Sequence, residues 1–210
     1  MIRPIAPDRL VEELASRIVA LPGDPWLRVG IDGPPGACPG ELADALVDPL
    51  RVRGRAALRV RAEDFLRPAS IRLELGRTNP DAFYERWYDL AALGREVLEP
   101  LRTNGSGRIL PTLWNPVTDR STRAAYLTVP PGGIVLLSGP LLLGAGLELD
   151  FTVHCGQSTA ARDRRTPDAD RWTLPAYLRY AEEVHPEYLA DVVLRMDDPR
   201  HPALVESAVS

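Results

Sequence analysis

A glycine- and proline-rich stretch, Gly33–Gly40, follows the short apolar run Trp26–Ile31 and precedes an amphipathic segment. It has the outline of the phosphate-binding pattern G-x-x-x-x-G-K-[ST]. In that pattern backbone N–H groups hold phosphates, the lysine contacts the β and γ oxygens, and the hydroxyl binds Mg²⁺. The last three positions here are Cys38, Pro39 and Gly40, so the second glycine, the lysine and the hydroxyl are all replaced. Backbone groups that could still contact a phosphate belong to Gly33, Gly36, Ala37, Cys38 and Gly40.

The residues at the end of this stretch favour a structural role over a nucleotide cradle. Pro39 removes a cation and a backbone donor, although proline suits the first turn of a helix, where its N–H would be unpaired. Glu41 falls in the same turn, where its carboxylate can interact with the positive end of the helix in place of a phosphate. That carboxylate would also repel a triphosphate. We therefore interpret the stretch as a strand-to-helix turn, with an ATP cradle as the alternative.

Two adjacent carboxylates, Glu63 and Asp64, follow the strand-like run Ala56–Ala62. Either can accept a proton from a hydroxyl. The role of general base for Glu63, with Asp64 as its alternative, is what the family resemblance described below implies. The competing interpretation is a solvated pair at the end of a strand. The 25 basic residues include no lysine, so any side-chain cation at a phosphate site must be an arginine.

Three arginines, Arg162, Arg164 and Arg165, are grouped near the C-terminal third of the chain. The planar guanidinium group matches the geometry of phosphate, and such groups can stabilise charge on a phosphoryl group in transfer. Asp163 and Asp168 lie close by in the sequence. A self-neutralising surface loop is therefore the other interpretation of this group.

The composition is that of an ordinary globular chain with one core. The 210 residues are 45% hydrophobic and 26% charged, which fits a single domain. A net charge of −4 gives no case for nucleic-acid binding, and no apolar run approaches the roughly 18 residues of a membrane span. We expect no leader peptide, no disulfide framework from the two cysteines, no metal-ligand cluster and a cytoplasmic location.

Strand-like and helix-like segments alternate, which predicts parallel βαβ units in a doubly wound α/β sheet flanked by helices. Gly133–Leu143 is the most apolar segment and is predicted to be a central strand buried on both faces. Asp8 and Asp89 are predicted helix N-caps, the second at a break between two helices. The other predicted helices cover 9–21, 41–50, 80–101 and 174–184, and the other strands cover 26–31, 56–62, 147–155 and 190–196.

The organisation expected from these segments is one domain over residues 1–198. It includes a small β-rich insertion at about 103–131 and a lid at about 162–172, and a polar C-terminal tail at 199–210 follows it. In parallel α/β sheets ligands bind at the carboxyl ends of the strands. The loops after Ile31, Ala62 and Leu137 are therefore the predicted ligand-binding edge.

Seven segments between about Leu27 and Met196 resemble, in the same order, segments of the uridine kinase-like branch of the P-loop nucleoside kinases. They are VGIDGPPGA, AEDFLRP, NPDAFYERWYD, WNPVTDR, IVLLSGPLLL, ARDRR and LADVVL. The resemblance implies a P-loop nucleoside-kinase-like three-layer sandwich, with ATP and Mg²⁺ as the cofactors of an active member. It places Glu63 at the general-base position and Ser138 at the position of the aspartate that organises the metal.

The same resemblance implies roles for residues of the lid and of the nucleoside side. Arg164 is expected to act in catalysis, and Arg162 and Arg165 are expected to bind the phosphates of the nucleotide. The substrate-binding positions are Phe83, Tyr84, Arg86, Trp114 and Asp119.

Some of these positions depart from the family pattern. Tyr84 replaces a ribose-binding carboxylate, Asn115 replaces an aspartate, and Asp119 replaces a histidine that helps to recognise uracil. The aromatic residues suit the stacking of a base, and packing in the core is their competing role.

Four positions of the phosphate chemistry are changed together: the lysine, the hydroxyl, the metal carboxylate and the base. We therefore predict a catalytically impaired, pseudokinase-like protein that binds a nucleoside, a nucleotide or a phosphorylated small molecule. The alternative is an active ATP-dependent phosphotransferase that uses the lid arginines and Glu63. A scaffold that acts through a protein surface is the third possibility, and each is compatible with a homo-oligomer or a protein partner.

Overall fold

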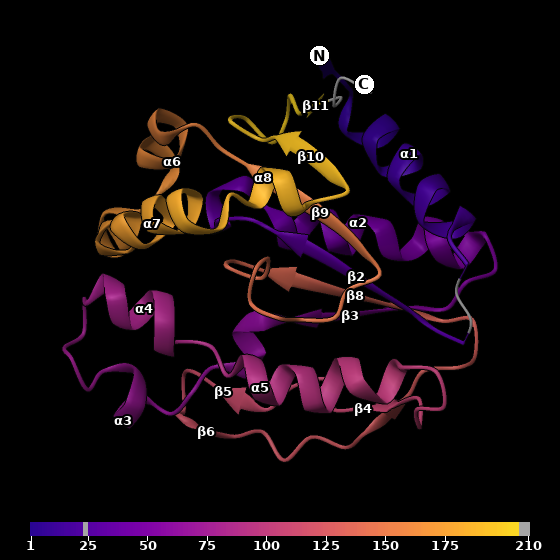
Figure 1. Ribbon diagram of the computed structural model, residues 1–210, viewed down its shortest axis with the longest axis horizontal. Coiled ribbons are helices and arrows are strands. Elements are labelled where there is room, and N and C mark those ends of the chain that lie inside the picture. The colour runs from indigo at the N-terminus through magenta and orange to yellow at the C-terminus, as the bar shows by residue number, and fades with distance from the viewer. Residues whose placement is uncertain (23–24, 206–210) are drawn as a thin grey trace.

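The computed structural model describes residues 1–22 and 25–205, and its centre is one seven-stranded sheet (Figure 1). The strand order is β1-β11-β10-β9-β2-β8-β3. All pairs from β10 to β3 are parallel, whereas β11 is antiparallel to both β10 and β1. The predicted mostly parallel α/β sheet is confirmed. The strands are β1 (Ile2–Pro4), β2 (Leu27–Asp32), β3 (Ala57–Arg61), β8 (Ile134–Gly139), β9 (Phe151–Gly156), β10 (Val192–Arg195) and β11 (Ala203–Val205).

Helices pack on both faces of the sheet and give three layers (Figure 1). On one face, α1 (Pro7–Ala20) and α2 (Pro39–Val52) enclose a core with the inward side chains of β2, β9 and β10. On the other face, α4 (Pro80–Arg86), α5 (Leu90–Leu93) and α7 (Leu174–Val184) enclose a second core. The shorter helices are α3 (Ala69–Arg72), α6 (Thr159–Arg165) and α8 (Pro186–Leu189).

The carboxyl ends of three neighbouring strands meet where the ligand-binding edge was predicted. β8 is buried along its whole length because it lies between β2 and β3 with both faces covered, as its apolar sequence predicts. Its last residues pair with the last residues of its neighbours: Asp32 lies opposite Gly139, and Arg61 lies opposite Ser138. This register brings the loops after β2, β3 and β8 together.

The predicted helix starts have different outcomes. The Asp89 side chain accepts a hydrogen bond from the Ala92 N–H and caps α5, so the predicted break between α4 and α5 is confirmed. The prediction for Asp8 was wrong. The N-cap of α1 is Ala6 and Pro7 opens the helix, while Asp8 lies in the first turn and makes no capping bond.

The segment between α5 and β8 is mostly irregular. It begins with a π-helical turn, Gly94–Leu98, and a 3₁₀ turn, Glu99–Leu101. Two small antiparallel ladders follow, one between β4 (Arg108–Ile109) and β7 (Leu127–Thr128), the other between β5 (Trp114–Asn115) and β6 (Arg120–Ser121).

The C-terminal segment departs from the predicted polar tail. Ala203–Val205 forms β11, which lies between β10 and β1, and neither β11 nor β1 was predicted. Each is three residues long, too short to show a period along the sequence. The antiparallel pairing of β11 with β1 places residues 203–205 beside residues 2–4 (Figure 1). The last part of the predicted tail, 206–210, lies outside the described residues.

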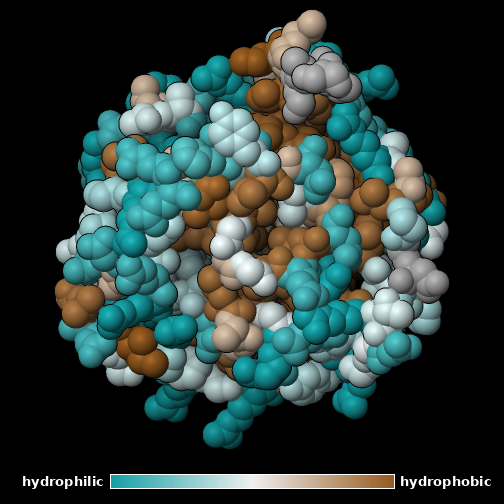
Figure 2. Space-filling view, in the orientation of Figure 1, coloured by the Kyte–Doolittle hydropathy of each residue, from teal (hydrophilic) through white to brown (hydrophobic). Residues whose placement is uncertain are grey.

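The surface carries a band of apolar residues on one face. Figure 2 shows this band running from the region of the termini toward the middle of the molecule, with hydrophilic residues on both sides. Among residues 1–22 and 25–205, no helix is long and apolar enough to cross a membrane.

Candidate functional site

The turn between β2 and α2 adopts a compact loop that ends in a left-handed residue. A 3₁₀ turn, Pro35–Ala37, is followed by Cys38 with φ 57° and ψ 45°, and Pro39 then opens α2. Cys38 occupies the position of the second glycine in the phosphate-loop pattern, and a positive φ explains why that pattern has a glycine there. The loop therefore has the backbone turn without the residue best suited to it.

We expect the substitution Cys38→Gly to stabilise the protein. A non-glycine residue in the left-handed region costs about 1–2 kcal/mol, and a glycine costs about 0.5–1 kcal/mol in unfolded-state entropy. The net gain should be about 1 kcal/mol in the free energy of unfolding, measured by urea denaturation. Cys38→Ala is the matched control, because it removes the thiol and keeps the Cβ. A gain of the same size in Cys38→Ala would show that the thiol, not the backbone, is the source of strain.

An arginine from the neighbouring strand β3 occupies the space above Gly40. A Cβ added to Gly40 would collide with Nη2 of Arg59. The same guanidinium forms an ion pair with Asp44 of α2, and its Nε donates to the Ser138 hydroxyl at 3.3 Å. Arg59 thus lies between the two positions, Gly40 and Ser138, that the resemblance assigns to the metal ligands.

Sequence reasoning missed Arg59. Strand alternation was the available signal, because Arg59 and Arg61 of β3 must point to the same face of the sheet. The contact with Gly40 depends on how α2 packs against β3, which no local pattern in the sequence specifies.

A polar cavity of about 320 Å³ opens beside this arginine. Its walls come from the start of α2, the ends of β3 and β8, and the turn after β3. The charged groups nearly balance, with two arginines against three carboxylates, so the cavity has no strong excess of positive charge. Its polar and charged side chains are Glu41, Asp44, Arg59, Arg61, Glu63 and Ser138.

Glu63 lies in the 3₁₀ turn that follows β3, Ala62–Phe65, and lines two cavities at once. One is the polar cavity, and the other is the aromatic cavity described below. Burial raises the pKa of Glu63, and the charge of Arg61 opposes the shift only in part. Burial also raises the pKa of Asp64, which lines neither cavity. Glu63 is therefore the carboxylate that can reach both spaces.

The raised pKa of Glu63 predicts a pH-dependent stability. A raised folded pKa means that the ionised carboxylate is disfavoured in the folded protein. The stability contributed by Glu63 is then fully present below its ordinary value of 4.5 and is lost as the pH rises through the folded pKa. Glu63→Gln should therefore be more stable than wild type at neutral pH, and this advantage should vanish below the ordinary value. Urea denaturation at several pH values measures it.

Glu182 is exposed, so Glu182→Gln is the control for the loss of one negative charge. A stability advantage of Glu63→Gln that stays constant with pH would contradict the inference that burial raises the pKa of Glu63.

The aromatic cavity has a volume of about 230 Å³ and lies next to the loop between β2 and α2. Phe83 packs edge-on against the rings of Trp87, Tyr88, Trp172 and Tyr177, with centroids 5.6–6.1 Å apart. Polar groups enter from the loop side, where Arg165 Nε donates to the Gly36 carbonyl at 2.7 Å. A planar ring with one polar substituent suits such a lining.

Phe83 is the one predicted substrate-binding residue that lines this cavity. The hydroxyl of Tyr84 donates to Glu183, and its ring packs under the Arg179 guanidinium at 4.5 Å. Arg86 forms an ion pair with Glu74 at 3.1 Å.

Trp114 and Asp119 are bonded to each other and lie outside the cavity. The Trp114 indole N–H donates to Asp119 at 3.0 Å, and Asp119 also accepts from the Ala69 N–H and from Arg72. These bonds fasten the segment around β5 to α3, so they are structural contacts. Trp172, in contrast, lines the cavity but was not among the predicted residues.

The three predicted lid arginines do not line a common cavity. Arg165 lines the aromatic cavity, whereas Arg162 lines a third cavity beside β9 and β10. Arg164 is exposed and lines none of the cavities of the described residues. Among residues 1–22 and 25–205, no group of three or more His, Cys, Asp or Glu side chains could hold a metal ion.

The fold matches that of several solved structures. A possible uridine kinase from Bacillus stearothermophilus is 20% identical, with a TM-score of 0.71 over 87% of this chain and 96% of that one. A putative fructose transport system kinase from Silicibacter sp. TM1040 is 17% identical, with a TM-score of 0.56 over 86% and 90% of the two chains. The YGR205w protein is 11% identical, with a TM-score of 0.59 over 96% and 100%.

These likenesses show that the chain has the P-loop kinase-like α/β fold, as its sequence predicts. No protein-family model matches the chain, and no curated protein matches its sequence.

Proposed function

We propose that this P-loop kinase-like fold serves as a binding protein for a ring-bearing small molecule, with a phosphoryl-transfer centre that is impaired. One observation carries the second half of the proposal: the Arg59 guanidinium lies between Gly40 and Ser138. The resemblance to the nucleoside kinases implies that, in an active member, those two positions supply a hydroxyl and a carboxylate to Mg²⁺. Here the first position has no side chain, the second is neutral, and a fixed cation lies between them.

The electrostatics of this arrangement disfavour a metal–nucleotide complex. A guanidinium has no lone pair with which to ligate a metal ion, and its charge repels a divalent cation at close range. Asp44, Glu41 and Glu63 of the same cavity offset part of that repulsion. The Arg59 side chain is 21% exposed and is held by Asp44, so it is not free to leave without losing that ion pair. The backbone donor that a lysine at this position would supply is also absent, because Pro39 has no N–H.

The aromatic cavity supports the binding half of the proposal. Its five rings offer faces and edges to a planar group, and Glu63 and Arg165 offer one acceptor and one cation at its rim. A nucleoside, a nucleotide or another phosphorylated small molecule with a ring has the matching chemistry. The buried rings also hold one another in place, which lowers the entropy cost of binding.

A second candidate function is an active phosphotransferase with a rearranged site. Glu63 lines both the polar and the aromatic cavity, which is the position that a base between a phosphate donor and an acceptor hydroxyl requires. Arg59 or Arg165 would then supply the missing cation. Metal-independent transfer that is lost in Glu63→Gln would favour this candidate.

The binding proposal is tested by titrating nucleosides and nucleoside monophosphates into the protein, with and without Mg²⁺, while tryptophan fluorescence is recorded. We expect saturable quenching that does not depend on Mg²⁺. The affinity should fall by about 5- to 150-fold in Trp172→Leu, because one stacking partner is worth about 1–3 kcal/mol. Trp26→Phe is the matched control, since this indole donates to the Val129 carbonyl and lines neither the polar nor the aromatic cavity. Equal binding by Trp172→Leu, or no binding of any of these probes, would contradict the proposal.

A further inference from the structure

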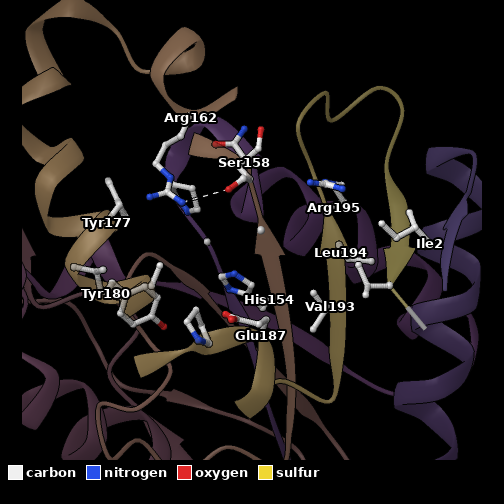
Figure 3. A pocket seen from close by; sticks show the side chains of 18 residues that line it. Ile2, His154, Ser158, Arg162, Tyr177, Tyr180, Glu187, Val193, Leu194 and Arg195 are labelled. Carbon is white, nitrogen blue, oxygen red and sulfur yellow. Dashed lines mark hydrogen bonds between the residues drawn. The ribbon is translucent and has the colours of Figure 1, made fainter. Parts of the chain in front are cut away.

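A third cavity, of about 250 Å³, lies on the sheet face opposite α1 and α2 (Figure 3). Its floor is formed by β9, β10 and β11, and α7 and α8 form one side. Tyr177 lines both this cavity and the aromatic cavity. Gly33 and Pro34 of the loop between β2 and α2 also line the third cavity.

A buried carboxylate orients a histidine toward this cavity. Val153 and Cys155 of β9 belong to the core under α1 and α2, so strand alternation turns His154 to the opposite face. Asp32 at the end of β2 is fully buried and lies 2.7 Å from Nδ1 of His154. Its other oxygen accepts a hydrogen bond from the Leu142 N–H at 2.9 Å.

The contact of Asp32 with Nδ1 of His154 leaves Nε2 as the ring nitrogen that can bind a ligand in the cavity. A carboxylate only accepts, so Nδ1 carries the proton that it donates to Asp32. In the neutral ring, Nε2 is then an acceptor. Within residues 1–22 and 25–205 no hydrogen bond reaches Nε2 of His154, which lines the cavity (Figure 3).

Two further polar atoms at the cavity lack partners. Nε of Arg162 and Oε1 of Gln157 are buried and make no hydrogen bond among the described residues. The Arg162 guanidinium makes one long hydrogen bond, from Nη2 to the Gln157 carbonyl at 3.3 Å, and lies 5.9 Å from the centre of the Tyr177 ring. Burial lowers the pKa of Arg162. An unpaired buried donor on a cation is costly unless an anion satisfies it.

Most of the remaining lining is apolar. It comes from the sheet on one side and from α7 and the loop after β8 on the other: Ile2, Leu141, Tyr180, Val193, Leu194 and Val205. Ser158, Glu187 and Arg195 add a hydroxyl, a carboxylate and a second guanidinium (Figure 3). The Tyr180 hydroxyl is held by the backbone of Leu143, which donates to it at 3.0 Å. The cavity therefore combines apolar walls with two guanidinium groups, one carboxylate and the Nε2 acceptor of His154.

We propose that this third cavity is a second ligand site, which binds a small hydroxylated acid. The acidic group of the ligand pairs with Arg162, its hydroxyl donates to Nε2 of His154, and its apolar body packs against Val193 and Tyr180. Among the described residues, the site shares only Tyr177 with the lining of the aromatic cavity.

The test uses 4-hydroxybenzoate as the probe, with benzoate and 4-methylphenol as analogues that lack the hydroxyl and the acid. Binding is followed by NMR of the imidazole resonances of His154, identified by their absence in His154→Asn. We expect saturable shifts with 4-hydroxybenzoate, and affinities about tenfold lower for each analogue, since each loses a hydrogen bond or an ion pair. Arg162→Gln should lower the affinity for 4-hydroxybenzoate about tenfold or more.

Two exposed residues serve as matched controls. Arg171→Gln removes a neighbouring surface guanidinium that is paired with Asp163, and His201→Asn removes an exposed imidazole. Neither should change the affinity. If His154→Asn does not fold, as judged by circular dichroism, Arg162→Gln decides the test because its guanidinium makes only one hydrogen bond. Unsaturable shifts in wild type, or unchanged affinity in Arg162→Gln, would overturn the proposal.

Discussion

With ATP, Mg²⁺ and a panel of nucleosides, the wild-type protein is expected to transfer phosphate about 10⁴-fold more slowly than the roughly 1–100 s⁻¹ of active kinases. The resemblance assigns the lost contacts to Pro39, Gly40 and Ser138. Each electrostatic contact of this kind stabilises a transition state by about 3 kcal/mol. Partial additivity leaves a loss of about 6 kcal/mol, and each 1.36 kcal/mol is about tenfold in rate. Coupled-enzyme detection of ADP measures the rate.

The matched variant restores the chemistry at the same positions. It combines Pro39→Lys, Gly40→Ser and Ser138→Asp with Arg59→Ala, because a side chain at position 40 would collide with the arginine. We expect this variant to bind ATP more tightly with Mg²⁺ than without it. Wild-type turnover within the range of active kinases would contradict the assignment of an impaired centre.

Phe83→Ala is expected to lower the free energy of unfolding by about 3–5 kcal/mol, the usual cost of truncating a buried phenylalanine. Phe83 is 6% exposed and packs against four aromatic rings, so its loss leaves a cavity that these rigid neighbours cannot fill. The same change should abolish ligand binding in the aromatic cavity. Urea denaturation and the fluorescence titration measure the two effects.

The neighbouring residue supplies the comparison for Phe83. Tyr84 is half-buried, lines none of the cavities described and contacts Arg179 and Glu183. Tyr84→Leu is expected to cost only about 1 kcal/mol, the size of one exposed hydrogen bond and one cation–π contact. Similar losses of stability in Phe83→Ala and Tyr84→Leu would show that packing of Phe83 against the four rings contributes no special share of the free energy of unfolding.

Much of the fold follows from local patterns. The apolar segment Gly133–Leu143 predicts the doubly covered strand that forms at Ile134–Gly139, and Asp89 predicts the helix start that it caps, because each depends on neighbours in the sequence. The edge strand β1 and its neighbour β11 depend on pairing between the two ends of the described chain, and neither shows a pattern of its own.

The candidate site is less predictable than the fold. Glu63 is identified by the family-like segment AEDFLRP, but the role of Arg59 comes from packing between β3 and α2. Trp114 and Asp119 lie in another family-like segment, and they bond to each other because the turn between β5 and β6 brings them together.

The most direct test of the central claim is calorimetric titration of ATP into the wild-type protein and Arg59→Ala, with excess Mg²⁺ and with EDTA. If the Arg59 guanidinium occupies the metal position, Mg²⁺ will not increase the affinity of the wild-type protein for ATP. Micromolar binding by wild type that is lost on chelation of Mg²⁺, and that is unchanged in Arg59→Ala, would contradict the claim.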